Sequence, residues 1–196
     1  MRDILKLGVI LMIYNVVAGA SLAYVNIMTK ERVTANKAVS EDAARKEVLP
    51  GMNGGFEQKG ALKVGDYDCP YWIGYADKAK TAPGGYVFIA RGKGYSSVIE
   101  TMVGVGKDGK ITGVKVISQQ ETPGLGAKIT EIRYGESDPW FYRQFKGKSA
   151  EDNLKVKKDG GMIDAVTGAT ISPRAVTNSI NKGLAKLREA VGGGGS

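Results

Sequence analysis

The chain contains no histidine, and Cys69 is its only cysteine. Without histidine it cannot build a Ser-His-Asp triad or hold haem through an imidazole. A single cysteine excludes an intrachain disulfide, a Cys/His zinc site and an all-cysteine iron–sulfur ligand set within this chain. No histidine can activate the thiol, so we predict that Cys69 is a small packed side chain; the alternative is a ligand to a cluster shared with another subunit. We predict no catalytic residue and no metal site.

The overall composition is that of a folded protein with a basic surface. The chain has 196 residues, 24% charged and 42% hydrophobic, enough for one anchored domain with its own core. Its net charge of +8 is most simply a solvated basic surface, although acidic partners or anionic lipid headgroups are alternatives. No nucleic-acid-binding motif is recognised, so we predict no nucleic-acid partner.

A long uncharged segment lies near the amino terminus. The 23 residues between Lys6 and Lys30 carry no charge and are mostly apolar. As a helix they extend about 35 Å, enough for a bilayer core of about 30 Å. A cleaved signal peptide is the alternative, because Ala18-Gly19-Ala20 is similar to a cleavage site. The apolar run is, however, longer than the apolar region of a typical signal peptide. We predict a cytoplasmic segment at 1–6 and one transmembrane helix at 7–29. Basic residues flank both ends, so the positive-inside rule does not fix the topology.

Helical patterns bracket the remainder of the chain. Residues 34–49 favour a helix that Pro50-Gly51 ends. Near the carboxyl terminus, Ser172 suits a helix N-cap and Pro173 a first helical residue. Apolar residues then recur at spacings of four, four, three and four, as one helical stripe. The stripe consists of Val176, Ile180, Leu184, Leu187 and Val191. Residues 192–196 are typical of an engineered linker, so we place the folded domain at 30–191.

Strand patterns fill the middle of the chain. We expect short strands in the Gly-rich stretch before residue 86, and clearer strands at 86–90, 96–105 and 111–118. In the last of these, Val114 and Val116 should share one face, with Gly113, Lys115 and Ile117 on the other. The sequence therefore predicts an α+β fold with an antiparallel or mixed sheet and flanking helices.

The turn at 107–110 joins the last two strands and predicts a hairpin, because Asp108-Gly109 lies between apolar runs. Residues 104–109 also match G-x-G-x-x-G. A dinucleotide-binding fingerprint must open a helix, and a strand follows here, so we assign these glycines to the turn.

Thr170 lies two residues before the predicted helix cap. Helix N-termini favour phosphate, because their N–H groups are unpaired and carry partial positive charge. Gly168 and Ala169 are small enough to let a phosphate approach the backbone, and Arg174 could pair with its oxygens. On spacing alone, an ordinary polar loop that enters a helix remains the simpler interpretation.

Three sequence blocks add a family resemblance. The run at 164–170, DAVTGAT, resembles the recognition motif of flavin transferases, Asp-x-x-Ser/Thr-Gly-Ala-Ser/Thr. The run at 121–126, ETPGLG, is similar to a signature of the same FMN-binding domain, and Trp140 followed by QFKGK at 144–148 resembles a third block. With the anchor, the chain resembles most the G subunit of Rnf complexes, which are ion-pumping ferredoxin:NAD oxidoreductases. The C subunit of the sodium-pumping NADH:quinone oxidoreductase is similar but usually longer.

The resemblance implies a role for each motif residue. The FMN phosphate would be esterified to Thr170 by a separate flavin transferase, which would recognise Asp164, Gly168, Ala169 and Thr170. Thr167 and Ser172 would hydrogen-bond the phosphate, and the 121–126 block would border the isoalloxazine ring. Trp140 suits the core better than ring stacking. The cofactor-binding set implied in this way is Thr167, Gly168, Ala169, Ser172, Glu121, Thr122, Gly124, Leu125 and Trp140.

The function implied is that of an electron carrier without a complete active site of its own. Electron relay needs no general acid or base, so the lack of histidine is compatible with it. The domain would lie on the extracytoplasmic side of the inner or plasma membrane. It would relay electrons between a membrane iron–sulfur centre and a second covalent-flavin subunit, in a complex that moves sodium ions or protons. Alternatives are a flavin carrier like the C subunit of the quinone-reducing sodium pump, an extracellular reductase domain and a non-redox anchored scaffold.

Overall fold

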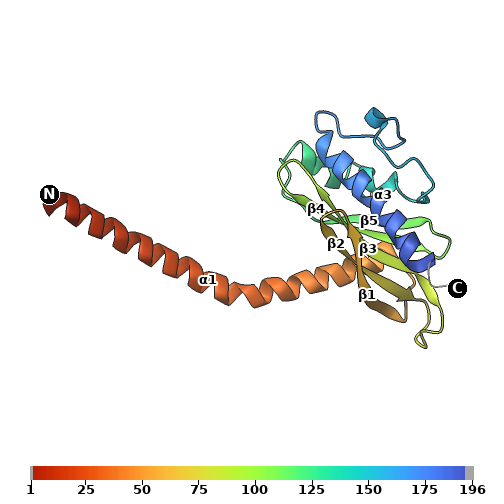
Figure 1. The fold of residues 1–196 in the computed structure, drawn as a ribbon, viewed down its shortest axis with the longest axis horizontal. Helices are drawn as coiled ribbons and strands as arrows, with labels where there is room; N and C mark the ends of the chain where they lie inside the picture. The colour runs from red at the N-terminus through yellow and green to blue at the C-terminus, as the bar shows by residue number, and fades with distance from the viewer. Residues whose placement is uncertain (1, 193–196) are drawn as a thin grey trace. The chain divides into compact units, whose positions relative to one another are not determined.

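The computed structural model describes residues 2–192. Of the linker predicted at 192–196, Gly192 is the last residue of the final helix, and residues 193–196 lie outside the described residues. The chain divides into two compact units, with the boundary between Glu41 and Asp42. The elements are α1 Arg2–Val48, β1 Gly55–Val64, β2 Tyr67–Tyr75, β3 Pro83–Lys93, β4 Val98–Gly106, β5 Ile111–Ser118, η1 Gly126–Thr130, α2 Trp140–Arg143, η2 Lys157–Asp159 and α3 Ile171–Gly192. Figure 1 labels the five strands and the two long helices, α1 and α3.

Helix α1 holds the apolar segment. Among residues 2–192 it is the one helix long and apolar enough to cross a membrane, judged by length and composition. Three polar side chains of this segment bond to the backbone one turn earlier: Asn15 donates to the Leu11 carbonyl at 2.9 Å, and Ser21 and Thr29 donate to the carbonyls of Val17 and Val25, each at 2.8 Å. Such bonds suit hydrocarbon, where a polar group must find its partner within the protein.

The helices predicted at 7–29 and 34–49 are one continuous helix. Residues 30–41 contain no glycine or proline, and most of them favour the helical state. The Thr34 hydroxyl donates to the Lys30 carbonyl at 2.9 Å, which satisfies it without interrupting the helix. Asp42 pairs with Lys46 at 2.6 Å, one turn further on, and this ion pair stabilises the last part of the helix.

The second unit is built on a five-stranded antiparallel sheet in the order β1-β2-β3-β4-β5, which confirms the α+β prediction. Strands β1 and β2 have ten and nine residues, longer than the short strands expected there. They pair from Gly55 opposite Tyr75 to Val64 opposite Tyr67. The two-residue turn between them contains Gly65 at a φ of +61°, a backbone conformation that favours glycine.

The hairpin of β4 and β5 is confirmed. Gly109 has a φ of +76°, and the Asp108 carboxylate accepts the Lys110 N–H at 3.2 Å. Strand β5 has the predicted bounds, while β4 begins at Val98, two residues later than expected. The G-x-G-x-x-G match therefore lies in a strand–turn–strand unit, as the absence of a following helix indicated.

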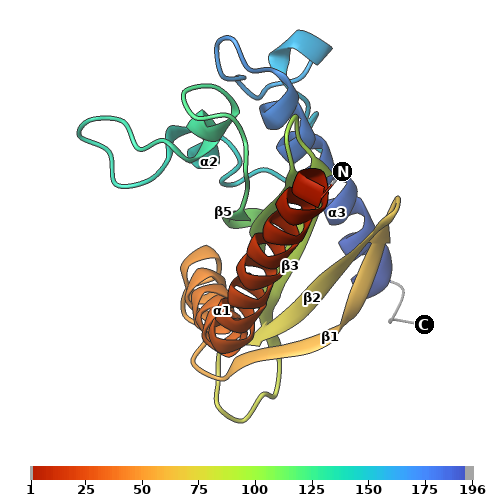
Figure 2. The same cartoon turned by 90° about the vertical axis from the view of Figure 1, so that its left-hand side faces the viewer.

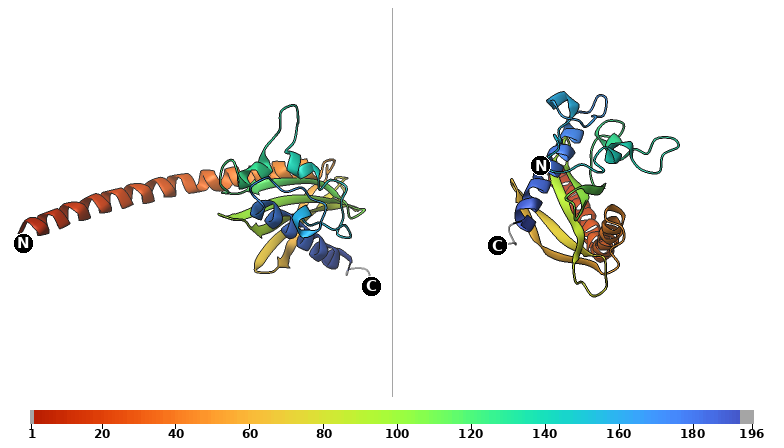
Figure 3. Two further views of the ribbon diagram at one scale, coloured as in Figure 1. Left: turned by 90° about the horizontal axis from the view of Figure 1, so that it is seen from above. Right: turned by 90° about the vertical axis from the view of Figure 1, so that its right-hand side faces the viewer.

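Helix α3 covers one face of the sheet, as Figures 2 and 3 show from three directions. The predicted stripe is confirmed: Val176 and Ile180 are fully buried, and Leu184 and Leu187 are nearly so. Val114 and Val116 belong to this core. Ile117 packs in a smaller core on the opposite face, where Val48 and Leu49 lie, as the predicted alternation required.

We predict that Gly183→Ala destabilises the second unit. A Cβ on Gly183 would lie 2.3 Å from a ring carbon of Phe88, so helix and sheet would have to separate. We expect a loss of about 1–3 kcal/mol. On an open helix face the same change would stabilise by about 0.5–1 kcal/mol, so the sign of the effect shows whether helix and sheet are in close contact at this point.

The measurement for Gly183→Ala is denaturant unfolding of the full chain. The control, Asn178→Ala on the exposed face of α3, should be neutral or slightly stabilising; a stabilised Gly183→Ala would contradict the close contact.

Candidate functional site

A cavity of about 400 Å³ in the second unit brings two of the motif blocks together. One wall comes from the segment after β5, another from the approach to α3, and Tyr95 contributes from the β3–β4 loop. Its volume lies in the range of about 300–1,000 Å³ that small-molecule sites occupy. The lining residues are Tyr95, Glu121, Thr122, Leu125, Gly126, Gly168, Ala169, Thr170, Ile171 and Ser172.

Thr170 directly precedes α3. Its carbonyl accepts the Arg174 N–H at 3.1 Å, the first turn of that helix. The helix therefore begins at Ile171. Ser172, which we predicted as the N-cap, lies inside the first turn instead. Because the helix begins earlier than predicted, Thr170 lies directly at its N-terminus, where unpaired N–H groups and partial positive charge favour an anion.

The loop before Thr170 is a tight turn. Ala169 donates its N–H to the Val166 carbonyl at 3.1 Å, and Gly168 has a φ of +81°, which disfavours any side chain there. Asp164, Thr167 and Gly168 are exposed. The turn thus presents Thr170 at the cavity with little side-chain bulk before it.

Glu121 joins three segments that surround the cavity. Its carboxylate accepts the N–H groups of Tyr95 and Ser96 at 3.0 Å and of Ser97 at 3.1 Å. It also accepts the hydroxyl hydrogen of Ser172 from the first turn of α3. Only 5% of Glu121 is exposed. Glu121 and Ser172 both line the cavity, and each holds the other in place.

Two opposing effects act on the pKa of Glu121. Burial raises the pKa of the carboxyl, because it penalises the charged form. The Ser172 hydroxyl and the three backbone N–H groups favour the carboxylate and outweigh burial, so the pKa is lowered from its usual value of 4.5. The carboxylate is therefore charged at neutral pH and is the common acceptor of this loop cluster.

The glycines of the 121–126 block have separate structural reasons. Gly124 has a φ of +75°, in the turn that carries Leu125 to the rim of the cavity. A Cβ on Gly126 would lie 2.3 Å from the Ser172 hydroxyl oxygen and 2.9 Å from a Glu121 carboxylate oxygen. A larger residue at 126 would thus separate Glu121 from Ser172.

Four predicted residues lie outside the cavity lining: Asp164, Thr167, Gly124 and Trp140. The Trp140 ring contacts Phe141 edge-on at 5.8 Å, lies under the Arg133 guanidinium at 4.3 Å and packs on the main core. This is the core position that the sequence favoured for it. Asp164 pairs with Lys157 at 2.8 Å.

The structure changes the cation expected near Thr170. The Arg174 guanidinium donates from Nε and Nη2 to the two oxygens of the Asp159 carboxylate, each at 2.6 Å, so the charge of Arg174 is already paired. Instead, the Lys158 ammonium donates to the Thr170 hydroxyl oxygen at 3.1 Å. Sequence reasoning missed both Lys158 and Tyr95. A Gly94-Tyr95 turn before a strand could have drawn attention to Tyr95, but no local pattern pairs residue 158 with residue 170.

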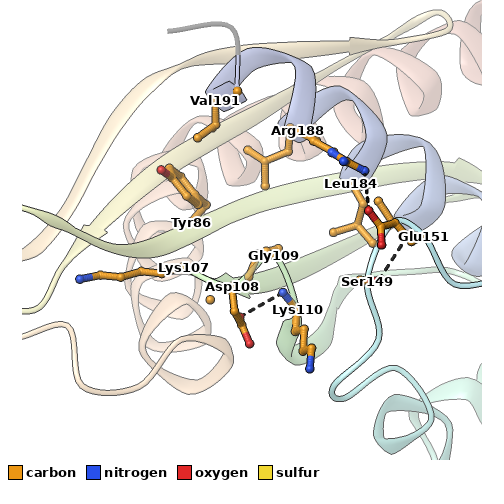
Figure 4. A pocket seen from close by; sticks show the side chains of 15 residues that line it. Tyr86, Lys107, Asp108, Gly109, Lys110, Ser149, Glu151, Leu184, Arg188 and Val191 are labelled. Carbon is orange, nitrogen blue, oxygen red and sulfur yellow. Dashed lines mark hydrogen bonds and ion pairs between the residues drawn. The ribbon is translucent and has the colours of Figure 1, made fainter. Parts of the chain in front are cut away.

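A second cavity, of about 440 Å³, lies at the other end of α3 (Figure 4). Tyr86, Leu184 and Val191 line it beside the β4–β5 turn, and Arg188 pairs with Glu151 at 3.1 Å on its border. It contains none of the predicted site residues. At 1.5 Å per residue, Leu184 lies roughly 20 Å along the helix from Thr170, so the two cavities are separate sites.

Cys69 is fully buried on β2 in the main core, which confirms the prediction of a packed side chain. Burial raises the pKa of its thiol, which keeps it protonated and unreactive at neutral pH.

Comparison with known proteins decides the family. The model of the FMN-binding domain matches residues 94–185, a range that contains both walls of the Thr170 cavity. Over 197 aligned residues, the chain is 32% identical to the G subunit of the Na(+)-translocating ferredoxin:NAD(+) oxidoreductase complex of Acetobacterium woodii, covering 93% of this chain and 91% of that protein. The chain belongs to the family of G subunits of ion-translocating oxidoreductase complexes.

Other relatives agree with this assignment. The G subunit of an ion-translocating oxidoreductase complex of Cereibacter sphaeroides is 34% identical over 182 residues, which cover 90% of this chain and 81% of that protein. The crystal structure of the C subunit of the Na(+)-translocating NADH-quinone reductase from Parabacteroides distasonis shares the fold, with a TM-score of 0.50 at 20% identity over 80% of this chain and 96% of that one. The resemblance that the three sequence blocks indicated is thus confirmed at the level of the G-subunit family.

Proposed function

We propose that this member of the G-subunit family is a membrane-anchored electron-transfer subunit that carries FMN, linked to Thr170 by a phosphoester. One observation carries the proposal: a single cavity joins the hydroxyl of Thr170 to the 121–126 block, although about 50 residues separate them in the sequence.

The phosphate end of the flavin fits the surroundings of Thr170. The hydroxyl lies at the N-terminus of α3 and receives a hydrogen bond from Lys158. Gly168 and Ala169 leave space beside it. A helix terminus and an ammonium group are both suited to a singly charged phosphodiester.

The ring end of the flavin finds large apolar and aromatic side chains in the same cavity. Tyr95, Leu125 and Ile171 line it and are 73%, 46% and 47% exposed. Large apolar side chains that line a cavity and remain in water indicate a site for an apolar or aromatic ligand. When bound, the flavin supplies the redox chemistry, while these residues hold the ring and limit its contact with water.

Covalent attachment suits a carrier that must keep its flavin in every redox state. A separate flavin transferase would need to read the motif from outside, and the exposure of Asp164, Thr167 and Gly168 permits this. Asp164, Gly168, Ala169 and Thr170 are the residues we assign to that recognition.

The wider setting is proposed from the family. Residues 7–29 would cross the inner or plasma membrane once, with 1–6 in the cytoplasm and the flavin domain, 30–191, on the extracytoplasmic side. Relatives are named as subunits of ion-translocating complexes, one of them a sodium-translocating ferredoxin:NAD(+) oxidoreductase. We propose that this chain relays electrons between a membrane iron–sulfur centre and a second covalent-flavin subunit, in a complex that couples this flow to sodium or proton translocation.

The direct test is the intact mass of the full chain after coexpression with its flavin transferase. We expect the mass to rise by one FMN less one water, with the added mass on the peptide that contains Thr170. An unchanged mass and a colourless protein would contradict the proposal and favour a non-redox scaffold. Subunits that co-purify in mild detergent would then separate an Rnf-type complex from a quinone-reducing relative.

A further inference from the structure

The only side-chain hydrogen bond that Lys158 makes among residues 2–192 joins its ammonium to the Thr170 hydroxyl oxygen, at 3.1 Å. Lys158 lies in η2, twelve residues before Thr170 in the chain. Two backbone bonds fix this position: Lys157 donates its N–H to the Ile163 carbonyl at 2.8 Å, and Ile163 donates to the Lys155 carbonyl at 3.0 Å. A closed loop therefore fixes the backbone that carries Lys158, and from there the side chain reaches the Thr170 hydroxyl.

The neighbouring charges are already paired with each other. Lys157 pairs with Asp164 at 2.8 Å, and Asp159 accepts both arms of Arg174 at 2.6 Å. Lys158 makes no ion pair within the part of the chain that the structure describes. Lys157 and Arg174 are thus each paired with a carboxylate, whereas Lys158, within residues 2–192, bonds only to the uncharged hydroxyl of Thr170. Its ammonium can therefore pair with an anion that binds at Thr170.

A phosphate on Thr170 would bring such an anion to this point. The free oxygens of a phosphodiester lie one bond beyond the phosphorus that binds the threonine oxygen, so they would stand beside the ammonium. Hydrogen bonds between an ammonium and a phosphate are among the stronger ones, because both partners are charged. The Thr167 hydroxyl, three residues earlier, has no such cation in contact among the described residues.

We infer that Lys158 is the phosphate-positioning residue of this site: it selects Thr170 for modification and stabilises the phosphate during and after transfer. The inference rests on the proposed function. In the transfer, the Thr170 oxygen forms a bond to the flavin phosphorus of a flavin dinucleotide, the P–O bond of the pyrophosphate breaks, and the nucleotide leaves as a monophosphate. The hydroxyl proton is released to a base on the transferase. Lys158 faces the phosphate oxygens, where charge is concentrated as the phosphoryl group moves.

The experiment follows flavin attachment to the full chain over time by intact mass, with purified transferase and flavin dinucleotide. Four proteins are compared: wild type, Lys158→Gln, Lys158→Arg and the control Lys155→Gln, which removes one exposed charge from the same segment. We expect Lys158→Gln to slow attachment by about two- to fivefold, which corresponds to the upper part of the range for an exposed charge pair. Lys158→Arg should restore most of the rate, and Lys155→Gln should match wild type. The ratio of the wild-type rate to the Lys158→Gln rate should fall towards one as salt is added, because salt screens the attraction between the ammonium and the phosphate.

The outcomes separate this inference from the function on which it rests. If wild type takes up no flavin, the proposed function fails. If wild type is modified at Thr170 while Lys158→Gln reacts at the wild-type rate, or is slowed no more than Lys155→Gln, the role of Lys158 is overturned and the function stands. Because Lys158 is exposed, we expect its variants to unfold at the wild-type temperature. This measurement excludes a folding defect as the cause of slower attachment.

Discussion

Replacing Thr170 by alanine is expected to abolish covalent flavin completely. The proposed phosphoester needs an oxygen nucleophile at this position, and alanine has none. The effect is all-or-none because Thr170 is the hydroxyl at the helix terminus that also contacts Lys158. The measurement is the intact mass of protein coexpressed with its transferase, together with flavin fluorescence of the denatured band on a gel.

Two variants make this result specific. Thr170→Ser keeps the hydroxyl and should retain at least part of the modification. Thr167→Ala removes the exposed hydroxyl three residues earlier, at a position of the motif that the transferase reads, so we expect slower attachment with the adduct still on Thr170. Flavin that survives Thr170→Ala would place the linkage elsewhere.

Replacing Glu121 should have the largest effect on stability. The Glu121→Ala change leaves five donors without their acceptor: the N–H groups of Tyr95, Ser96 and Ser97 and the hydroxyls of Ser97 and Ser172. A buried donor left unpaired costs about 1–3 kcal/mol, and water at the exposed rim will compensate some of the five. We expect a loss of about 3–5 kcal/mol in the free energy of unfolding. Denaturant titration of the full chain measures it, and Glu131→Gln, on the exposed side of the same segment, serves as the control.

The pH dependence follows from the lowered pKa of Glu121. Because the folded protein binds this proton less tightly than the unfolded chain does, the carboxylate stabilises the fold fully above its usual pKa of 4.5. That contribution is lost as the pH falls below about 4.5 and through the lower folded pKa. Glu121→Gln, which cannot titrate, should be less stable than wild type at pH 7, and the gap should narrow under acid. A gap that stays constant down to about pH 3 would show that the carboxylate charge is not what holds the loops.

The same variant also bears on the flavin site. Glu121 lies in the cavity lining, and it fixes Tyr95 on one side and the first turn of α3 on the other. Loss of this link should loosen both walls. We therefore expect Glu121→Gln to accept flavin more slowly than wild type while still carrying it on Thr170.

Several features could be read from the sequence because they depend on neighbouring residues alone. The stripe of α3 follows from helical periodicity, and the β4–β5 hairpin from Asp108-Gly109 between apolar runs. At two other places the structure differs from the prediction made from local sequence. The break expected near residues 30–34 is absent, because nothing in that stretch ends a helix. Ser172 looked like an N-cap, but its hydroxyl bonds to a residue that is 51 positions away.

The sequence by itself determined several elements of this protein and indicated its family. Apolar periodicity, turn residues and three short blocks depend on order along the chain, and they mark the apolar segment of α1, the sheet hairpin, the last helix and Thr170. Only the tertiary structure decided which charges meet at the site. Glu121 binds Ser172, Asp159 occupies Arg174, and Lys158 contacts Thr170. Each of these contacts depends on loop closure and on competition between nearby partners, which spacing along the chain does not encode.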